Sequence, residues 1–183
     1  PWSEQMLQQA LASGLPMVVD ADALNILSLG RLSIPETTKE WVITPHPGEA
    51  ARLLNVTTGK VQADRFSAVK ALQKKFDCPA LLKGAGSLVC TSNDALIGLC
   101  TAGNPGMATG GMGDVLSGIV AGLMAQGVKS DKALSLGVCL HAKAADISAE
   151  TGERGLVATD LFGPLKELVN GMINRTTNGV NKE

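Results

Sequence analysis

A glycine-rich segment at residues 103–114 carries the strongest chemical signal in the sequence. It reads GNPGMATGGMGD, with five glycines in twelve positions, and the apolar run that begins at Val115 follows it. Glycines allow backbone N–H groups to approach an anion closely, and the N-terminus of a helix favours phosphate. Asp114, in the first turn of the predicted helix, could act as a general base beside that phosphate. The alternative is that Asp114 only caps the helix and that the glycines form a tight turn.

A second candidate segment is Lys83-Gly84-Ala85-Gly86-Ser87, which follows a short apolar run. A lysine at the end of a strand, beside two glycines, can reach a phosphate or line a nucleotide cleft. The alternative is a glycine hairpin with a solvated lysine. Neither glycine segment is a P-loop, because no Lys-Ser or Lys-Thr pair follows the glycines.

Two further polar segments follow predicted strands. His46 lies between two prolines, close to Glu49, so an imidazole and a carboxylate are held in a rigid turn. Alternatively, His46 is an exposed turn residue and Glu49 complements the dipole of the next helix. Asp20 and Asp22 could bind Mg²⁺ or a polar ligand, although Asp22 is equally well explained as a helix N-cap. The other histidine, His141, is interpreted as a buried structural residue.

Alternating strands and helices must position these groups. Apolar periodicity predicts strands at residues 17–20, 41–44, 80–83, 87–91 and 95–99. It predicts helices at residues 3–13, 24–29, 49–54, 61–76, 114–125, 131–150 and 161–173. This pattern indicates an α/β fold with a mostly parallel sheet, mixed near residues 80–99 and covered by helices on both faces. Ligands in such folds gather at the carboxyl ends of the strands, where Asp20, His46 and Lys83 are expected.

Some details of these elements are also predicted. Ser3 is the expected N-cap of the first helix, and Thr159 or Asp160 that of the last. Phe66 is expected on the inner face of helix 61–76, together with Val61, Val69, Leu72 and Phe76. Turns are expected at Gly84–Gly86 and at residues 92–94. We assign residues 1–173 to one domain and residues 174–183 to a polar tail.

Composition limits the function classes. The 183 residues carry a formal net charge of −1, and no basic cluster is present, which argues against a nucleic-acid partner. No apolar run is long enough for a membrane span, so we expect no membrane association. The four cysteines form no metal-ligand pattern and are expected to be buried, reduced thiols of a cytoplasmic protein.

Four segments together resemble one family. VVDADALN, ITPHPGEAARLL, LLKGAGSLV and GNPGMATGGMGDVLSGIVAGL resemble the ADP-dependent NAD(P)H-hydrate dehydratases, which belong to the ribokinase-like superfamily. The resemblance covers residues 1–168 and implies a ribokinase-like three-layer sandwich. It also implies repair of nicotinamide cofactors: (6S)-hydrated NADH or NADPH is dehydrated at the expense of ADP or ATP, with Mg²⁺. With ADP, the products would be NADH or NADPH, AMP and phosphate.

The resemblance also implies roles for individual residues. Asp114 would be the catalytic base, and His46 with Asp114 would contact the hydrated cofactor. Glu49 would help to position Mg²⁺. The residues expected to bind the nucleotide are Lys83, Gly84, Ala85, Gly86, Ser87, Gly111 and Gly113.

The resemblance further implies partners. Family members carry strands and a glycine-rich segment before the helix with which this chain begins, so the expected partner is an upstream part of the same polypeptide, including an epimerase domain. That part would cover a sheet edge left open here. A homo-oligomer is also expected. Two other functions remain open: a small-molecule kinase of the same superfamily, and a non-catalytic nucleotide-binding module.

Overall fold

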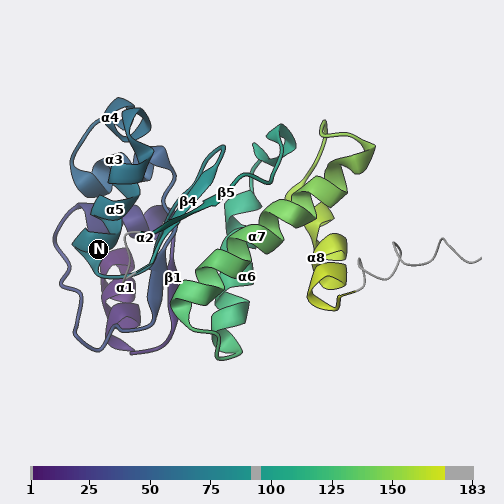
Figure 1. The fold of residues 1–183 in the computed structure, drawn as a ribbon. Coiled ribbons are helices and arrows are strands. Elements are labelled where there is room, and N and C mark those ends of the chain that lie inside the picture. The colour runs from purple at the N-terminus through teal and green to yellow at the C-terminus, as the bar shows by residue number, and fades with distance from the viewer. Residues whose placement is uncertain (1, 92–95, 172–183) are drawn as a thin grey trace, which may run out of the picture.

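The computed structural model describes residues 2–91 and 96–171 (Figure 1). The turn predicted at residues 92–94, the tail at residues 174–183 and the predicted end of the last helix at residue 173 lie outside the described residues. No helix in the described part of the chain is both long enough and apolar enough to cross a membrane.

Five short strands form one mixed sheet in the order β1-β2-β3-β4-β5. Strands β1 (Met17–Val19), β2 (Trp41–Ile43) and β3 (Ala80–Leu82) run parallel to one another. Strands β4 (Ser87–Cys90) and β5 (Ile97–Cys100) continue the sheet from β3 in antiparallel fashion. The mixed sheet predicted from the sequence is therefore confirmed, and β1 forms its outer edge among the described residues.

Helices cover both faces of this sheet, as Figure 1 shows. One face packs against α1 (Trp2–Ala12), α2 (Ala21–Ser28), α3 (Pro47–Leu54), α4 (Thr58–Ala63) and α5 (Arg65–Phe76). The other face packs against α6 (Met112–Ala125) and α7 (Ser130–Ser148), and α8 (Phe162–Val169) packs on α7. The predicted three-layer arrangement is confirmed.

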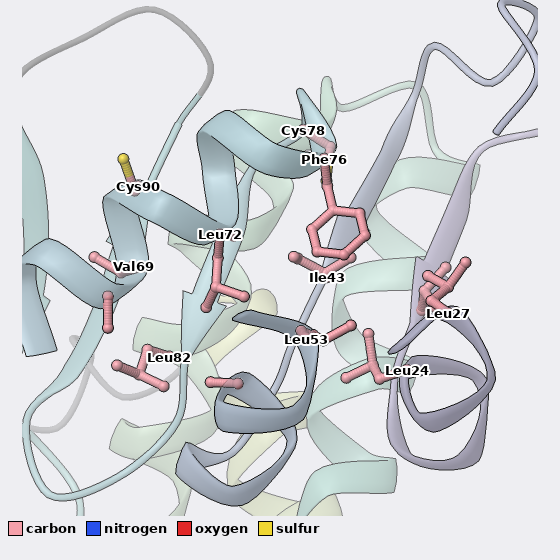
Figure 2. Packing of buried hydrophobic residues seen from close by; sticks show 14 of the residues in the cluster. Leu24, Leu27, Ile43, Leu53, Val69, Leu72, Phe76, Cys78, Leu82 and Cys90 are labelled. Atoms are coloured by element: carbon pink, nitrogen blue, oxygen red, sulfur yellow. The ribbon is translucent and has the colours of Figure 1, made fainter. Parts of the chain in front are cut away.

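Alternation along the strands divides the core between the two faces. Trp41 and Ile43 join the cluster under α1 to α5, whereas Val42 between them joins the cluster under α6 and α7. Figure 2 shows the first cluster, in which Leu72 and Phe76 of α5 lie above the sheet. The rings of Trp41 and Phe76 meet edge to face, with centroids 6.2 Å apart.

The single helix predicted over residues 61–76 is wrong. The chain breaks at Asp64, which has φ −145° and ψ 84°, and the carboxylate of Asp64 accepts a hydrogen bond from Ser67 N–H at 2.9 Å. Asp64 is thus the N-cap of a second helix, α5. Phe66 falls on the outer side of α5 and is 53% exposed, so its predicted core position is also wrong.

Three predicted helix caps are wrong as well. Ser3 lies inside α1, which begins at Trp2. Asp20, and not Asp22, is the N-cap of α2. Asp160 closes a short 3-10 turn by accepting a hydrogen bond from Val157 N–H, and α8 begins at Phe162 without a side-chain cap.

The cysteines are only partly as expected. Cys78 and Cys90 are buried, but Cys100 is half-buried and Cys139 is exposed. Both exceptions lie on the α6–α7 side of the sheet, where the chain borders the cavity described below.

Candidate active site

A cavity of about 630 Å³ lies beyond the β3–β4 turn, between the glycine-rich segment and α7. It brings together several segments that the sequence singled out. Its walls include Lys83, Gly84, Ala85, Gly86, Ser87, His46, Pro47, Gly113, Met112, most of residues 100–109, and Val138, His141 and Ala142 of α7. The expected convergence of His46 and the two glycine segments on one site is therefore present.

The loop after β3 is held in place by Arg65, at the start of α5. The guanidinium donates hydrogen bonds to the carbonyls of Ala85 (2.7 Å), Leu82 (3.2 Å) and Lys83 (3.3 Å). Gly84 has φ +147°, and a Cβ at this position would lie 2.9 Å from Arg65 Nη2. A side chain at position 84 would therefore displace the guanidinium that shapes the loop.

Lys83 crosses from this loop to the end of β1. The ammonium of Lys83 lies 2.8 Å from Asp20 Oδ1, and Ser117 of α6 donates a hydrogen bond to Asp20 Oδ2 at 3.0 Å. The backbone N–H of Ala21 donates to Asp20 Oδ1 as well, at 2.9 Å. The sequence suggested that Asp20 could bind Mg²⁺ or a polar ligand. In the structure it accepts hydrogen bonds from three donors and fixes the direction of Lys83.

The first turn of α6 lies beside this ion pair. Gly111, the N-cap residue, has φ +85° and supplies no side-chain cap, so the first N–H groups of the helix have no side-chain acceptor. A Cβ at Gly113 would lie 3.5 Å from Lys83 Nζ and 3.6 Å from Asp20 Oδ2. The absence of a side chain at Gly113 thus lets an ammonium and an uncapped helix N-terminus approach each other, which is a favourable setting for phosphate.

The glycine-rich segment is anchored at its other end by Asp146 of α7. One carboxylate oxygen accepts from Gly103 N–H at 3.0 Å, and the other accepts from the side-chain amide of Asn104 at 3.1 Å. Asn104 Oδ1 in turn accepts from Gly106 N–H at 3.1 Å. The segment is therefore held at both ends by α6 and α7, with the cavity between them.

His46 and Glu49 form a capping box at the start of α3. Nδ1 of His46 accepts from Gly48 N–H at 3.0 Å and Glu49 N–H at 3.4 Å, while Glu49 Oε2 accepts from His46 N–H at 2.8 Å. Because Nδ1 is an acceptor, the neutral ring carries its proton on Nε2, which lies 3.3 Å from Glu49 Oε1. The imidazole is half exposed and borders the cavity, whereas the Glu49 carboxylate is buried beneath it.

The predicted base, Asp114, lies outside the cavity wall. It is exposed on the first turn of α6, one residue after Gly113. Gly111 and Glu49 do not line the cavity either. Most of the predicted site residues thus lie at the cavity wall. Asp114, in contrast, is an exposed carboxylate near the N-terminus of α6, beside the cavity.

His141 is buried, as the sequence predicted, but it also borders the cavity. Within the described residues its Nε2 atom has no hydrogen-bond partner. The pKa of His141 is lowered to about 4, mainly by burial; a hydrogen bond with the Met112 backbone opposes the shift, and the nearby charge of Lys83 adds to it. The imidazole is therefore neutral at pH 7.

This shift predicts a loss of stability in mild acid. In the unfolded chain, His141 becomes protonated below its ordinary pKa of 6.5. In the folded chain, it becomes protonated only when the pH falls to about 4. The contribution of His141 to the free energy of unfolding is present above pH 6.5 and falls as the pH drops toward 4, by ~3 kcal/mol in total. Urea unfolding of the protein and of His141→Gln at pH 7.5 and pH 5 measures it. The variant should lose less stability than the parent over that interval, and equal losses would contradict the assignment.

The chain matches one protein family over most of its length. The family model for NAD(P)H-hydrate dehydratase matches residues 1–166, which is most of the chain. The chain belongs to this family.

Relatives in the NAD(P)H-hydrate dehydratase family include bifunctional enzymes. The bifunctional NAD(P)H-hydrate repair enzyme of Coxiella burnetii is 49% identical over 170 residues, covering 92% of this chain and 34% of that enzyme. The ADP-dependent (S)-NAD(P)H-hydrate dehydratase of Neisseria meningitidis is 43% identical over 164 residues, covering 88% of this chain and 54% of that enzyme. The chain thus spans about a third of the bifunctional relative and about half of the dehydratase.

Solved structures support the same fold. An ADP/ATP-dependent NAD(P)H-hydrate dehydratase from Bacillus subtilis, co-crystallized with ATP/Mg²⁺, superposes with a TM-score of 0.78 at 25% identity, covering 88% of this chain and 57% of that one. A ribokinase-like superfamily protein from Enterococcus faecalis superposes with a TM-score of 0.75 at 28% identity, covering 93% and 58%. The expected ribokinase-like fold is confirmed.

Sequence reasoning missed three residues that organise this dehydratase-family site. Arg65 lay within a stretch interpreted as one continuous amphipathic helix, and Ser117 and Asp146 lay within predicted helices. Their partners are distant in the chain: 20 residues separate Arg65 from Ala85, and 43 separate Asp146 from Gly103. The charge of Arg65 and Asp146 gave no local hint, because other charged residues, such as Lys70 and Lys143, lie in the same segments.

Proposed function

We propose that this chain carries the ADP-dependent dehydration of (6S)-hydrated NADH and NADPH, a repair reaction that yields the intact cofactor, AMP and phosphate. The observation that supports it most is the meeting of Lys83 with the uncapped first turn of α6 at the wall of a cavity of about 630 Å³. A cavity of this size suits a nucleotide. The expected setting is a cytoplasmic homo-oligomer.

The residues of this chain suit a phosphoryl transfer followed by an elimination. The terminal phosphoryl group of ADP would pass to the 6-hydroxyl of the hydrated ring, breaking the bond to AMP. Phosphate would then leave from that carbon while the neighbouring ring carbon loses a proton, which forms the ring double bond. Asp114 would take the hydroxyl proton, and Lys83 with the N–H groups around Gly111 and Gly113 would stabilise the phosphate oxygens. The Lys83–Ser87 loop would hold the nucleotide, and His46 would contact the hydrated cofactor.

Magnesium would neutralise charge between the phosphates during this transfer. Among residues 2–91 and 96–171, no group of three or more histidine, cysteine, aspartate or glutamate side chains is placed to hold a metal by itself. This fits Mg²⁺, which is commonly held by one or two carboxylates, waters and the phosphates of a substrate. Both oxygens of Glu49 already face His46, Oε2 through the backbone N–H and Oε1 at 3.3 Å from Nε2, so a role of Glu49 in positioning Mg²⁺ would require the imidazole to move.

The outer edge of β1 supports an upstream partner segment. β1 is the first strand in the sheet order, so no described strand pairs with its outer edge. Three of the large exposed apolar residues, Trp2, Met6 and Leu15, lie on or just after α1, the helix that precedes β1 in the chain. An additional strand would satisfy backbone groups along that edge. We therefore propose that residues upstream in the same polypeptide, with an epimerase domain in front of them, pack against this side.

A small-molecule kinase is the second candidate, because the same base and the same anion site would serve it. The family assignment favours the dehydratase. A non-catalytic nucleotide-binding module would need the cavity but not the exposed carboxylate of Asp114.

A complex with ADP tests where the nucleotide binds. We expect the adenosine in the cavity between the Lys83–Ser87 loop and the glycine-rich segment, with the phosphates directed at the first turn of α6. Soaking or co-crystallization with ADP and Mg²⁺ provides the measurement. A nucleotide bound at the amino-terminal edge of the sheet would contradict both the site and the proposed function.

A further inference from the structure

The loop between β3 and β4 directs three carbonyl groups toward one side chain, that of Arg65. The guanidinium donates hydrogen bonds to Ala85 O at 2.7 Å, Leu82 O at 3.2 Å and Lys83 O at 3.3 Å. Nε of Arg65 is a buried atom without a hydrogen-bond partner among the described residues, so the guanidinium is inserted against the loop rather than extended into solvent. Lys83 and Ala85 line the cavity, but Arg65 does not. The carbonyls of Lys83 and Ala85 therefore point to the side of the loop away from the cavity.

The same peptide groups direct two N–H groups the opposite way. All peptide bonds of this loop are trans, and the carbonyl and the N–H of a trans peptide point in opposite directions. Gly84 N–H belongs to the peptide group of the Lys83 carbonyl, and Gly86 N–H follows the Ala85 carbonyl in the same way. Gly84 and Gly86 both line the cavity. Their N–H groups therefore lie on the cavity side of the loop.

These two N–H groups are available to a ligand. Within residues 2–91 and 96–171, neither donates to a protein acceptor. The preceding peptide group differs, because Lys83 N–H donates to the carbonyl of Pro45 at 2.9 Å. The loop therefore offers two backbone donors to the cavity, directly after Lys83 in the chain.

The direction of these peptide groups depends on Arg65 because glycines adjoin them. Gly84 has φ +147° and Gly86 has φ +72°. Glycine adopts positive and negative φ at similar cost, so the peptide groups beside these residues can rotate. A carbonyl rotated into the cavity would repel a phosphate oxygen, because both oxygens carry negative charge. The hydrogen bonds from Arg65 oppose that rotation.

We propose that Arg65 is a positioning residue for the nucleotide, which holds the N–H groups of Gly84 and Gly86 toward the phosphate oxygens of ADP. The inference rests on the proposed function, which places ADP in this cavity. Lys83 and Gly113 line the same cavity, so the two N–H groups extend a set of donors around one anionic group. Arg65 touches no ligand and acts only through the loop.

Calorimetric titration of ADP with Mg²⁺ into the whole protein that the gene encodes tests this proposal. Arg65→Ala removes the hydrogen bonds to the loop, and the dissociation constant of ADP should rise about 10-fold, the effect of weakening one hydrogen bond to a charged group. At saturating ADP, kcat should stay near the parent value, because the reacting groups are unchanged. Ethylguanidine, which supplies the deleted atoms, should restore the affinity in this variant and leave the parent unchanged. Arg65→Lys keeps the charge but lacks the planar fork, and it should also bind ADP more weakly.

Arg52→Ala is the matched control. Arg52 is also a helical arginine outside the cavity wall, and its guanidinium donates to Asn25 Oδ1 at 2.7 Å. Its replacement should leave the affinity for ADP unchanged. Thermal melting of each variant identifies the folded protein to which the titration refers, and if Arg65→Ala does not fold, Arg65→Lys takes its place.

The outcomes separate this inference from the proposed function. Parent-like affinity for ADP in the folded Arg65 variants would overturn the role of Arg65 and leave the nucleotide site in place. An equal loss of affinity in Arg52→Ala would overturn it too, because the effect would not depend on the loop. A parent protein that binds no ADP would contradict the proposed function, and this inference with it.

Discussion

Replacing Asp114 with asparagine is expected to reduce turnover of hydrated NADH by ~10²- to 10⁴-fold, the contribution typical of a positioned general base. Asparagine keeps the shape and hydrogen-bonding capacity of the side chain but cannot accept the hydroxyl proton. Because Asp114 is exposed and lies outside the cavity wall, the fold and the affinity for ADP should change little. Steady-state kinetics and a nucleotide titration of the same preparation separate the two effects.

Asp131→Asn is the matched control for this experiment. Asp131 is also an aspartate in the first turn of a helix, α7, but it lies at the end of that helix away from the cavity residues Val138 and His141. Its replacement should leave turnover near the parent value. If Asp114→Asn behaved like Asp131→Asn, Asp114 would be a helix-end residue and the proposed base would be wrong.

Lys83→Met is expected to weaken ADP binding by about 10- to 100-fold, since a hydrogen bond to a charged group contributes ~1.5–3 kcal/mol. Methionine preserves much of the aliphatic stem but removes the ammonium that lies beside Gly113 and the first turn of α6. Isothermal titration calorimetry with ADP provides the dissociation constant. An unchanged affinity would show that the phosphates do not reach this end of the cavity.

A double variant separates binding from stability. In Lys83→Met the carboxylate of Asp20, whose side chain is only 14% exposed, loses its ionic partner, so the fold itself is expected to be destabilised. Adding Asp20→Asn removes the unpaired charge and should recover part of the stability without restoring ADP affinity. Recovery of both would mean that Lys83 acts on the nucleotide only through the fold.

The strands were the part of the fold that local sequence predicted best. Met17–Val19, Trp41–Ile43 and Ala80–Leu82 are short aliphatic or aromatic runs, and a polar residue, proline or glycine follows each within a few positions. The carboxyl-edge placement of Asp20, His46 and Lys83 followed from that pattern alone. Asp20 and Lys83 indeed meet there, 2.8 Å apart.

Helix boundaries and the supports of the site were harder to predict. Asp64 looks like one polar position in an amphipathic helix until its carboxylate is seen to cap α5. Arg65 shapes the loop after β3, and Asp146 anchors Gly103, through hydrogen bonds that form only after the chain has folded. No spacing rule within a segment reports such partners, which is why neither residue was predicted to belong to the site.

The most direct test of the account is recovery of NADH absorbance from the S epimer of hydrated NADH, in the presence of ADP and Mg²⁺. The protein is this chain together with any residues that its gene encodes ahead of Pro1. We predict recovery that requires the nucleotide and yields AMP and phosphate in amounts equal to the NADH formed. A stable phosphate ester without recovered NADH would indicate the kinase instead, and bound but unconsumed ADP would indicate a non-catalytic module; either result would contradict the proposed repair function.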